Sequence, residues 1–428
     1  MRGSEAGTDE RLARIARRLA EAAKRPDALG AFGAESHGYR LNPPLPESRV
    51  AAFEAEHGIV LPEGYRRFVT DVGDGGAGPA YGLLSLADTY DTVSDSFAGH
   101  LREPSPFVPD TLYGYDWWDG FWGPDDRPDP LQGTLAIVHH GCTSYTQLVV
   151  TGPGRGRLVN VDLNGVPAPY VLEDPDFLAW YERWLDELLA GYRVTWFGEK
   201  IPGDEAALLR ILAGDPAPQR RARAARSLGF LPLITATAAG ALASAAADAD
   251  PLVRRAALEV AWRSGTAAVE PAARLALTDP DASVRAEAIS VLRALGTADA
   301  AERARPLLGD PDPEVAWRAM RAMADSGRLS AADLAPLITG RGGGGRGGAR
   351  TREAAVYVLA KACDEVAALL AEALGDEDPR VRRQAVQTGE QRDERSLLPQ
   401  MRRMREAETD HYVRINLDRV IAAWSADG

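Results

Sequence analysis

The chain has 428 residues, which is too long for one compact core and indicates two or three domains. Its apolar fraction of 45% and charged fraction of 26% are ordinary for a folded protein and exclude wholesale disorder. The two cysteines, Cys142 and Cys363, lie in different halves and cannot form a disulfide framework, so we expect a reducing cytoplasm. No uninterrupted apolar run opens the chain, and we therefore expect no secretory signal.

The net charge of −13 is unevenly distributed. Residues 26–200 carry 26 Asp and Glu against 11 Lys and Arg, a net of −15, whereas residues 201–428 have a net of −1. This acidic field disfavours nucleic acid and anionic membranes and favours a basic protein partner, with plain solubility as the alternative. The uncharged stretch Leu228–Ala247 consists mostly of small residues and contains Pro232, which predicts a buried helix rather than a membrane span.

The N-terminal third opens with predicted helices. Residues 9–25 have the pattern of a short basic amphipathic helix, which Pro26 and the following glycines end. Val50 and Phe53 mark a second helix. The buried face of a third helix, which ends at Gly73 as a left-handed cap, is formed by Tyr65, Phe68, Val69 and Val72.

Strand-like runs follow these helices. The glycine-rich turn Asp74–Gly78 comes after a helix and lacks a following Lys-Ser/Thr, so a tight connection is favoured over a phosphate loop. It leads into a first strand candidate, Tyr81–Leu86. Further strands are predicted at Thr134–His139, Gln147–Thr151 and Arg157–Val161, the last two joined by a hairpin turn.

A strongly patterned helix closes this domain. We expect Asp174 to be its N-cap and Pro175 its first residue. Its apolar stripe predicts a core face rather than a cofactor site and consists of Phe177, Trp180, Tyr181, Trp184, Leu185 and Leu188. The order of elements predicts an α+β domain with an antiparallel sheet flanked by helices.

Residues 38–200 resemble the SUKH superfamily, which includes fungal Smi/Knr-type cell-wall regulators and many bacterial immunity proteins. The resemblance is carried by three segments in the family's order: 61–86, 141–162 and 174–189. The most specific motif residues are Leu61, Pro62, Tyr65, Phe68, Gly73, Gly75, Gly76, Gly78 and Gly82. Pro46 departs from the family, which tends to have Ser or Thr at that helix cap. The resemblance implies a protein-binding module without catalytic residues.

A Trp/Asp segment, Tyr113–Pro130, is the most unusual local composition in the chain, with three Trp, five Asp and one Arg. Turn-forming residues saturate it, so we expect a surface loop. Trp is enriched in binding hot spots and Asp complements a basic partner, although the tryptophans could instead fold back onto the sheet. The candidate protein-binding residues are Trp117, Trp118, Asp119, Trp122, Asp125 and Asp126.

A repeat begins near residue 205. Matching dipeptides start at Val253, Val284, Val315, Thr351, Val381 and Val413, with spacings of 31, 31, 36, 30 and 32 residues. The longest interval contains a glycine-rich insertion, 340–348, which we interpret as a linker. Asp-Pro pairs that predict helix starts occur at Asp250, Asp279, Asp310, Asp312 and Asp378. The pattern resembles short HEAT-like repeats, which implies an all-α solenoid.

No catalytic motif is found. Adjacent His139 and His140 would point to opposite faces of a strand and cannot chelate a metal together, so we expect no metal, no cofactor and no enzyme activity. We predict an N-terminal helix and linker at 1–37, a SUKH-type domain at 38–200 and a HEAT-like domain at 201–428. The leading hypothesis is an immunity-type protein that neutralises a basic toxin domain. The alternative is a cytoplasmic scaffold or regulatory adaptor whose repeats hold a second partner.

Overall fold

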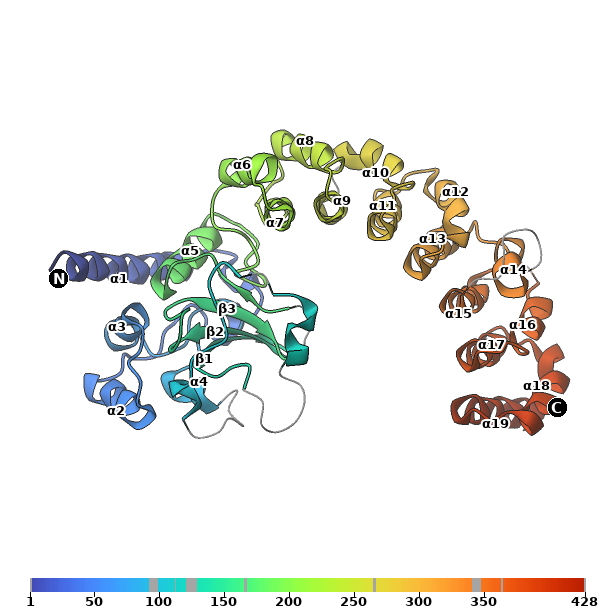
Figure 1. Cartoon of the computed structure of the whole chain (residues 1–428), viewed down its shortest axis with the longest axis horizontal. Helices are drawn as coiled ribbons and strands as arrows, with labels where there is room; N and C mark the ends of the chain where they lie inside the picture. The colour runs from blue at the N-terminus through green and yellow to red at the C-terminus, as the bar shows by residue number, and fades with distance from the viewer. Residues whose placement is uncertain are drawn as a thin grey trace. The chain divides into compact units, whose positions relative to one another are not determined.

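The computed structural model describes residues 2–91, 99–111, 113–120, 129–164, 168–264, 267–340, 348–362 and 365–426. The chain divides into two compact units (Figure 1). The first unit comprises Met1–Leu208 together with Phe230–Leu233, and the second comprises Leu209–Gly229 together with Ile234–Gly428.

The first unit contains a four-stranded antiparallel sheet in the order β1-β2-β3-β4. Its strands are β1 (Thr134–Gly141), β2 (Ser144–Val149), β3 (Leu158–Asp162) and β4 (Tyr170–Val171). Because side chains alternate along a strand, Leu148 and Leu158 lie on one face and Val149 and Val159 on the other. The sheet is therefore covered on both faces.

The run Tyr81–Leu86, which we predicted as a strand, does not form one. Leu83 makes only isolated bridges to Gly76 and Val138. The helix α4 (Leu86–Asp91) begins at Leu86, whose N–H donates to Asp74 Oδ1 at 2.7 Å. This side-chain bond starts a helix where the apolar run alone favoured a strand.

The first face of the sheet carries the larger core. It packs against helices α1 (Arg2–Ala22), α3 (Glu63–Asp71) and α5 (Phe177–Leu189), and α2 (Glu47–His57) lies beside α3. The largest fully buried side chains here are Trp180, Trp184, Tyr181, Phe68 and Phe177. Helix α1 belongs to this core, because Leu12, Ile15 and Leu19 are buried in it.

The cap that we predicted for α5 is wrong by two residues. Asp176 is the N-cap, and its side chain accepts the N–H of Ala179 at 2.7 Å. Asp174 is buried and instead binds the guanidinium of Arg183 through two hydrogen bonds of 2.6 and 2.7 Å. Sequence spacing alone did not separate these two aspartates.

The second unit is an array of helices in two rows (Figure 1). The inner row contains α7 (Pro218–Leu228), α9 (Pro251–Ser264), α11 (Ala282–Ala294), α13 (Pro313–Asp325), α15 (Ala349–Val358), α17 (Pro379–Gln391) and α19 (His411–Ala426). The outer row contains α8 (Ala236–Ala245), α10 (Glu270–Ala276), α12 (Ala300–Ala304), α14 (Ala331–Thr339), α16 (Ala367–Ala373) and α18 (Leu398–Ala407). Helix α6 (Glu205–Gly214) spans the boundary between the units.

Short 3₁₀ helices complete the two units. They are η1 (Ala28–Gly30), η2 (Ala34–Ser36), η3 (His100–Arg102), η4 (Tyr115–Gly120), η5 (Ala267–Val269), η6 (Arg305–Gly309), η7 (Leu359–Lys361) and η8 (Arg395–Leu397).

Most inner helices start at the second acid of an Asp-x-Asp pattern. Asp281, Asp312 and Asp378 are N-caps whose side chains accept backbone N–H groups from the first turn. Asp279 and Asp310, which we also expected to start helices, lie two residues earlier and accept the N–H of the cap residue at 2.9 Å. The same acids have a second role between repeats, described below.

Within the described ranges, no helix has the length and apolar character needed to cross a bilayer. The uncharged stretch 228–247 lies at the end of α7, in the following turn and in α8.

Candidate functional site

Neighbouring inner helices are joined by a ladder of arginine–carboxylate pairs. The arginine four residues after each cap binds the first acid of the next repeat through its Nε and Nη2 atoms, as Arg254 binds Asp279 at 2.7 and 2.7 Å and Arg285 binds Asp310 at 2.8 and 2.8 Å. The other rungs are Arg221–Asp248, Arg352–Asp376 and Arg382–Glu408. The Nη1 atom of Arg285 also donates to the carbonyl of Asp279 in its own loop at 2.8 Å. Bidentate pairs of this kind fix both distance and orientation.

The ladder has no arginine in α13. Ala316 occupies the position four residues after the cap Asp312, and α15 is capped by Gly348 without a side chain. Between α13 and the segment of α15 and η7, the described contacts include the rings of Trp317 and Tyr357, whose centroids are 5.7 Å apart. Inner helices elsewhere are held by a rung, whereas this joint carries aromatic side chains at its surface.

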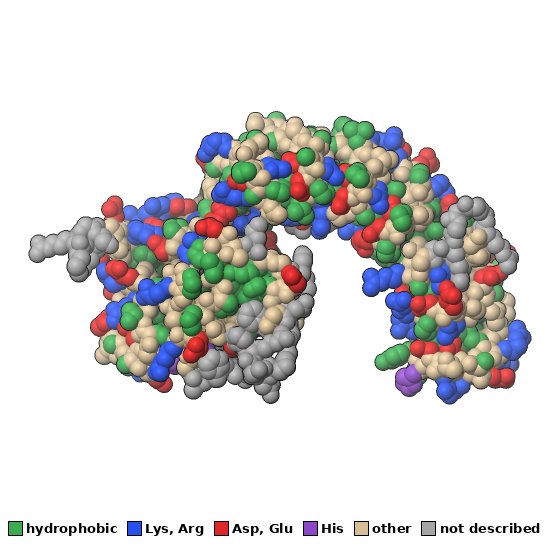
Figure 2. Space-filling model, viewed as in Figure 1, with side chains coloured by type: hydrophobic (Ala, Val, Ile, Leu, Met, Phe, Trp, Pro, Cys, Tyr) green, Lys and Arg blue, Asp and Glu red, His purple; other side chains and the backbone are tan. Residues whose placement is uncertain are grey.

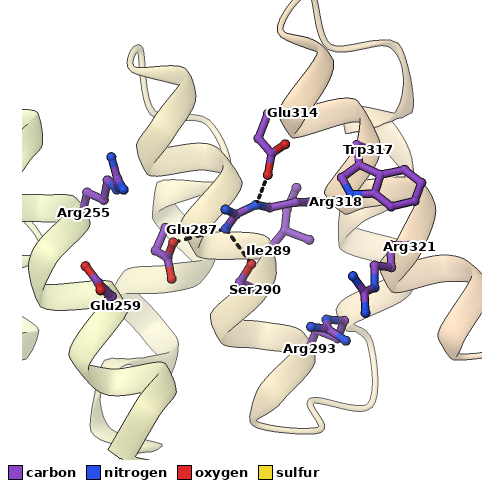
Figure 3. A pocket seen from close by; sticks show the side chains of 10 residues that line it. All are labelled: Arg255, Glu259, Glu287, Ile289, Ser290, Arg293, Glu314, Trp317, Arg318 and Arg321. Carbon is purple, nitrogen blue, oxygen red and sulfur yellow. Dashed lines mark hydrogen bonds and ion pairs between the residues drawn. The ribbon is translucent and has the colours of Figure 1, made fainter. Parts of the chain in front are cut away.

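A groove runs along the inner row across this joint. It consists of two adjoining hollows of about 390 and 460 Å³ that share Glu314 and Trp317. Figure 3 shows the first hollow, formed by side chains from α9, α11 and α13. The second hollow continues over α15 and α17 and is lined by Arg350, Glu353, Tyr357, Arg380 and Gln384 among others. We call the two hollows together the inner groove.

Arg318 lies at the centre of the first hollow (Figure 3). Its Nε donates to Glu314 at 2.7 Å, and its Nη1 donates to Glu287 at 3.1 Å and to Ser290 Oγ at 2.8 Å. Burial by itself would lower the pKa of Arg318, but the hydrogen bond with Glu314 and the charge of Glu287 raise this pKa above its usual value. The guanidinium is therefore a fixed, permanently charged part of the groove wall.

Two aromatic side chains supply apolar surface in the groove. Trp317 is half-buried, and Tyr357 is 48% exposed. Figure 2 shows basic and acidic side chains interspersed over the helices of the second unit. Exposed aromatic area within a field of oriented charges is the composition typical of protein-binding hot spots.

The Trp/Asp segment is placed differently from our expectation. Trp118 is only 3% exposed and packs with Phe107, Val149 and Val159 against the second face of the sheet. Trp117 is half-buried and stacks on Phe107, with centroids 5.2 Å apart. For Trp118 the structure therefore corrects the contact role that we predicted. Asp119 lies in η4, and Trp122, Asp125 and Asp126 fall outside the described residues.

The SUKH motif residues have structural positions in the first unit. Leu61, Tyr65 and Phe68 are buried in its larger core, and Pro62 is the N-cap residue of α3. The motif glycines lie where two backbone segments approach closely: residues 73, 75, 76, 78 and 82. A Cβ on Gly76 would come within 2.5 Å of the carbonyl oxygen of Arg40. A Cβ on Gly82 would come within 2.2 Å of the carbonyl oxygen of Gly76. Pro46, the position at which the SUKH family tends to have Ser or Thr, is the N-cap residue of α2 and makes no side-chain cap hydrogen bond.

His139 and His140, at the end of β1, make separate contacts. Among the residues that the structure describes, no three His, Cys, Asp or Glu side chains are close enough to hold a metal ion. His140 is buried and bonds Thr146 Oγ1 through Nε2 at 2.7 Å, while His139 stacks on Tyr145. Burial, with a smaller effect of His139, lowers the pKa of His140 to about 4. His140 is therefore a neutral core side chain at pH 7.

Comparisons with known proteins bear on the second unit. Residues 269–340 match the family model for HEAT repeats. No curated protein matches the chain. Among solved structures, the chain is similar to YibA of Escherichia coli, with 16% identity, coverage of 58% of this chain and 89% of that one, and a TM-score of 0.40. The CpcE–CpcF complex of phycocyanin lyase from Nostoc sp. covers 52% of this chain and 95% of its own, at 18% identity and a TM-score of 0.32. A designed armadillo repeat protein in complex with the peptide (KR)4 covers 52% and 99%, at 17% identity and a TM-score of 0.28.

The family match identifies HEAT repeats at residues 269–340, and the two rows of helices with their recurring caps extend a HEAT-like architecture through the C-terminal region. The SUKH resemblance of residues 38–200 and an immunity function receive no support from these comparisons.

Sequence reasoning missed the inner groove. Its side chains come from different repeats, and no single repeat contains a recognisable motif. Aligning the repeats on their cap residues provides the missing signal, because Glu314, Arg318 and Arg321 lie two, six and nine residues after Asp312 and form one face of α13. The same positions give Glu259, nine residues after Asp250 in α9, and Arg350 and Tyr357, two and nine residues after Gly348 in α15. Arg255 lies five residues after Asp250, which is the position of Trp317 after Asp312.

Proposed function

We propose that this chain is a non-catalytic adaptor that holds a protein partner in the inner groove of its HEAT repeats. The observation that supports this proposal is the inner groove: two adjoining hollows over α9 to α17, with Trp317 lining both and Tyr357 lining the second. Stacked repeats create extended surfaces that suit a protein segment better than a small ligand. The paired charges of the groove, for example Arg318 with Glu287 and Glu314, fit orientation of a partner rather than proton transfer.

The test is a pair of variants of the full chain. Partners are captured from the native host with the wild-type protein, and the affinity of each captured partner is then measured for Trp317→Ala/Tyr357→Ala. We expect a loss of roughly 2–4 kcal/mol in binding free energy, because buried aromatic anchors carry most of the energy of such interfaces. The matched control is Leu275→Ala on outer helix α10, where Leu275 is 78% exposed.

Unchanged affinity in the double variant, with an unchanged thermal midpoint, would remove the inner groove from partner binding. If the double variant has a lower thermal midpoint than wild type, the affinity is measured at a temperature where both proteins are fully folded. A weaker affinity there reports lost binding and not partial unfolding.

A second candidate function concerns the first unit. The SUKH resemblance and the net charge of −15 on residues 26–200 support an immunity-type role, in which this unit covers a basic toxin domain. Its affinity for such a domain should fall steeply between roughly 50 and 300 mM salt, because exposed charges are screened over this range. A neighbouring gene for a secreted protein with a variable toxic C-terminal domain would favour this role, and its absence together with flat salt dependence would count against it.

A further inference from the structure

The charges of the inner groove do not cancel. All four glutamates that line it have arginine partners: Glu287 and Glu314 share Arg318, Glu259 pairs with Arg226 at 3.0 Å, and Glu353 lies 3.8 Å from Arg383. Three lining arginines also have acidic neighbours, Asp325 for Arg293 and Arg321 and Asp378 for Arg380.

Two lining arginines differ from the rest. Arg255 on α9 and Arg350 on α15 are exposed, and neither has an acidic partner within the described part of the chain. They lie toward opposite ends of the groove, with Trp317 on the intervening helix α13. The groove therefore presents two guanidinium groups without described acidic partners, on helices to either side of Trp317.

We propose that the inner groove binds an extended acidic segment of a protein, a proposal that rests on the proposed function. One carboxylate of the segment binds Arg255, another binds Arg350, and an apolar side chain between them packs on Trp317 and Tyr357. A guanidinium matches a carboxylate through two parallel hydrogen bonds, and this geometry gives orientation as well as attraction.

The spacing of the helices sets the length of the segment. Helices α9, α11, α13 and α15 are successive members of the inner row, and packed helices lie roughly 9 Å apart. The two arginines are then separated by about 27 Å along the row, which an extended chain rising about 3.3 Å per residue covers in about eight or nine residues. The partner segment should carry its acidic side chains at about this separation.

Nucleic acid is the competing polyanion. Four carboxylates line the groove and the chain has a net charge of −13, and both features repel a continuous run of phosphates. A segment with few, separated carboxylates avoids that repulsion, and its central apolar side chain uses the aromatic floor.

The experiment selects phage-displayed random twelve-residue peptides on the full-length protein. The selected peptides should carry Asp or Glu toward both ends and an aromatic or aliphatic residue between them. Their affinity should fall at least about tenfold for Arg255→Glu/Arg350→Glu, since each reversal replaces an attraction by a repulsion. The matched control is Arg402→Glu/Arg403→Glu on outer helix α18, which makes the same change in net charge and should leave the affinity unaltered.

The outcomes separate the two proposals. Peptides that depend on Trp317 and Tyr357 but bind Arg255→Glu/Arg350→Glu as tightly as wild type, or that are enriched in Lys and Arg, overturn the acidic segment and leave the adaptor function intact. Peptides that ignore both pairs of variants, or an empty selection, count against both proposals. Binding of a twelve-nucleotide oligouridylate that is tighter than that of any selected peptide, and is lost in Arg255→Glu/Arg350→Glu, also overturns the acidic segment.

Discussion

Individual side chains in the first unit show how burial decides between two roles for the same residue type. Trp118 and Trp117 are neighbours in a segment with the composition of a binding loop, yet Trp118 lies in the core below the sheet. Composition predicts the kinds of contact that a segment can make. The location of the Trp118 ring depends instead on the apolar second face of the sheet, which the ring covers and which is formed by Val149, Val159 and Val161.

Trp118→Ala should destabilise the protein by about 3–5 kcal/mol, because a large buried ring leaves a cavity that the sheet cannot close. Trp117→Ala, which removes a half-buried ring, should cost clearly less. Urea unfolding of the two variants gives the comparison. An unaltered unfolding midpoint for Trp118→Ala together with weaker partner binding would restore our original contact prediction for this residue.

His140 makes the stability of the first unit depend on pH. Burial lowers its pKa in the folded chain from 6.5 to about 4, so the unfolded chain takes up a proton first as the pH falls. The contribution is complete above pH 6.5 and is lost between pH 6.5 and 4, amounting to roughly 3 kcal/mol.

The measurement compares urea unfolding at pH 7 and pH 4.5 for wild type and for His140→Gln, which can keep a hydrogen bond to Thr146. The other histidines are common to both proteins, so the difference between the two pH dependences isolates His140. Equal losses on acidification would assign the acid sensitivity to other groups.

At the scale of the element, the arginine ladder explains why the repeats could be predicted from recurring residues at a regular spacing. The cap at Asp281, the arginine at 285 and the acid at 310 recur because each repeat must meet the next in the same geometry. Helix starts were predictable to within two residues, and the error arose at Asp279 because its carboxylate serves the ladder rather than the cap.

Arg285→Ala should lower the free energy of unfolding by about 3 kcal/mol, because Asp310 is left as a buried carboxylate without its guanidinium. The side chain of Arg285 is 13% exposed and that of Asp310 is 6% exposed, so solvent replaces little of the lost interaction. Arg321→Ala is the control, since Arg321 is 55% exposed and lies 3.8 Å from Asp325. Equal unfolding midpoints for the two variants would show that the ladder does not stabilise the array.

At the scale of the whole molecule, the first compact unit extends to Leu208, past the boundary at residue 200 that we predicted. Lys200 is 2% exposed, and its Nζ donates to Glu187 at 2.8 Å and to the carbonyls of Ile201 and Gly203. The segment Phe230–Leu233 also belongs to this unit, where the carbonyl of Phe230 accepts the N–H of Arg193 at 2.9 Å.

A fragment of residues 1–233 should therefore melt at a higher temperature than the fragment 1–200 that the sequence suggested. The shorter fragment loses both carbonyl acceptors of Lys200 and the buried side chain of Ile201, and leaves part of a buried charge network unsatisfied. Thermal unfolding followed by circular dichroism measures both midpoints. Identical midpoints would place residues 201–233 outside the cooperative unit.

The sequence predicted those features that depend on local pattern, such as the buried faces of α3 and α5 and the inner helices. It did not predict the two-residue strand Tyr170–Val171, which is too short to have a pattern, or the inner groove, which exists only when side chains of several repeats are brought side by side. Motif recognition finds functional residues that are close in sequence, whereas the residues of the inner groove come from helices that are far apart in sequence.

Ala316 leaves the joint between α13 and α15 without the bidentate arginine pair found at the other joints of the described array. At the other joints a bidentate ion pair resists bending, whereas between α13 and α15 resistance comes from apolar packing and from partly exposed contacts such as Trp317 with Tyr357. A pull on the ends of the array would therefore open this joint before its neighbours. Trp317 and Tyr357 also line the inner groove. Opening this joint would separate the two rings and weaken the binding of a segment held between them.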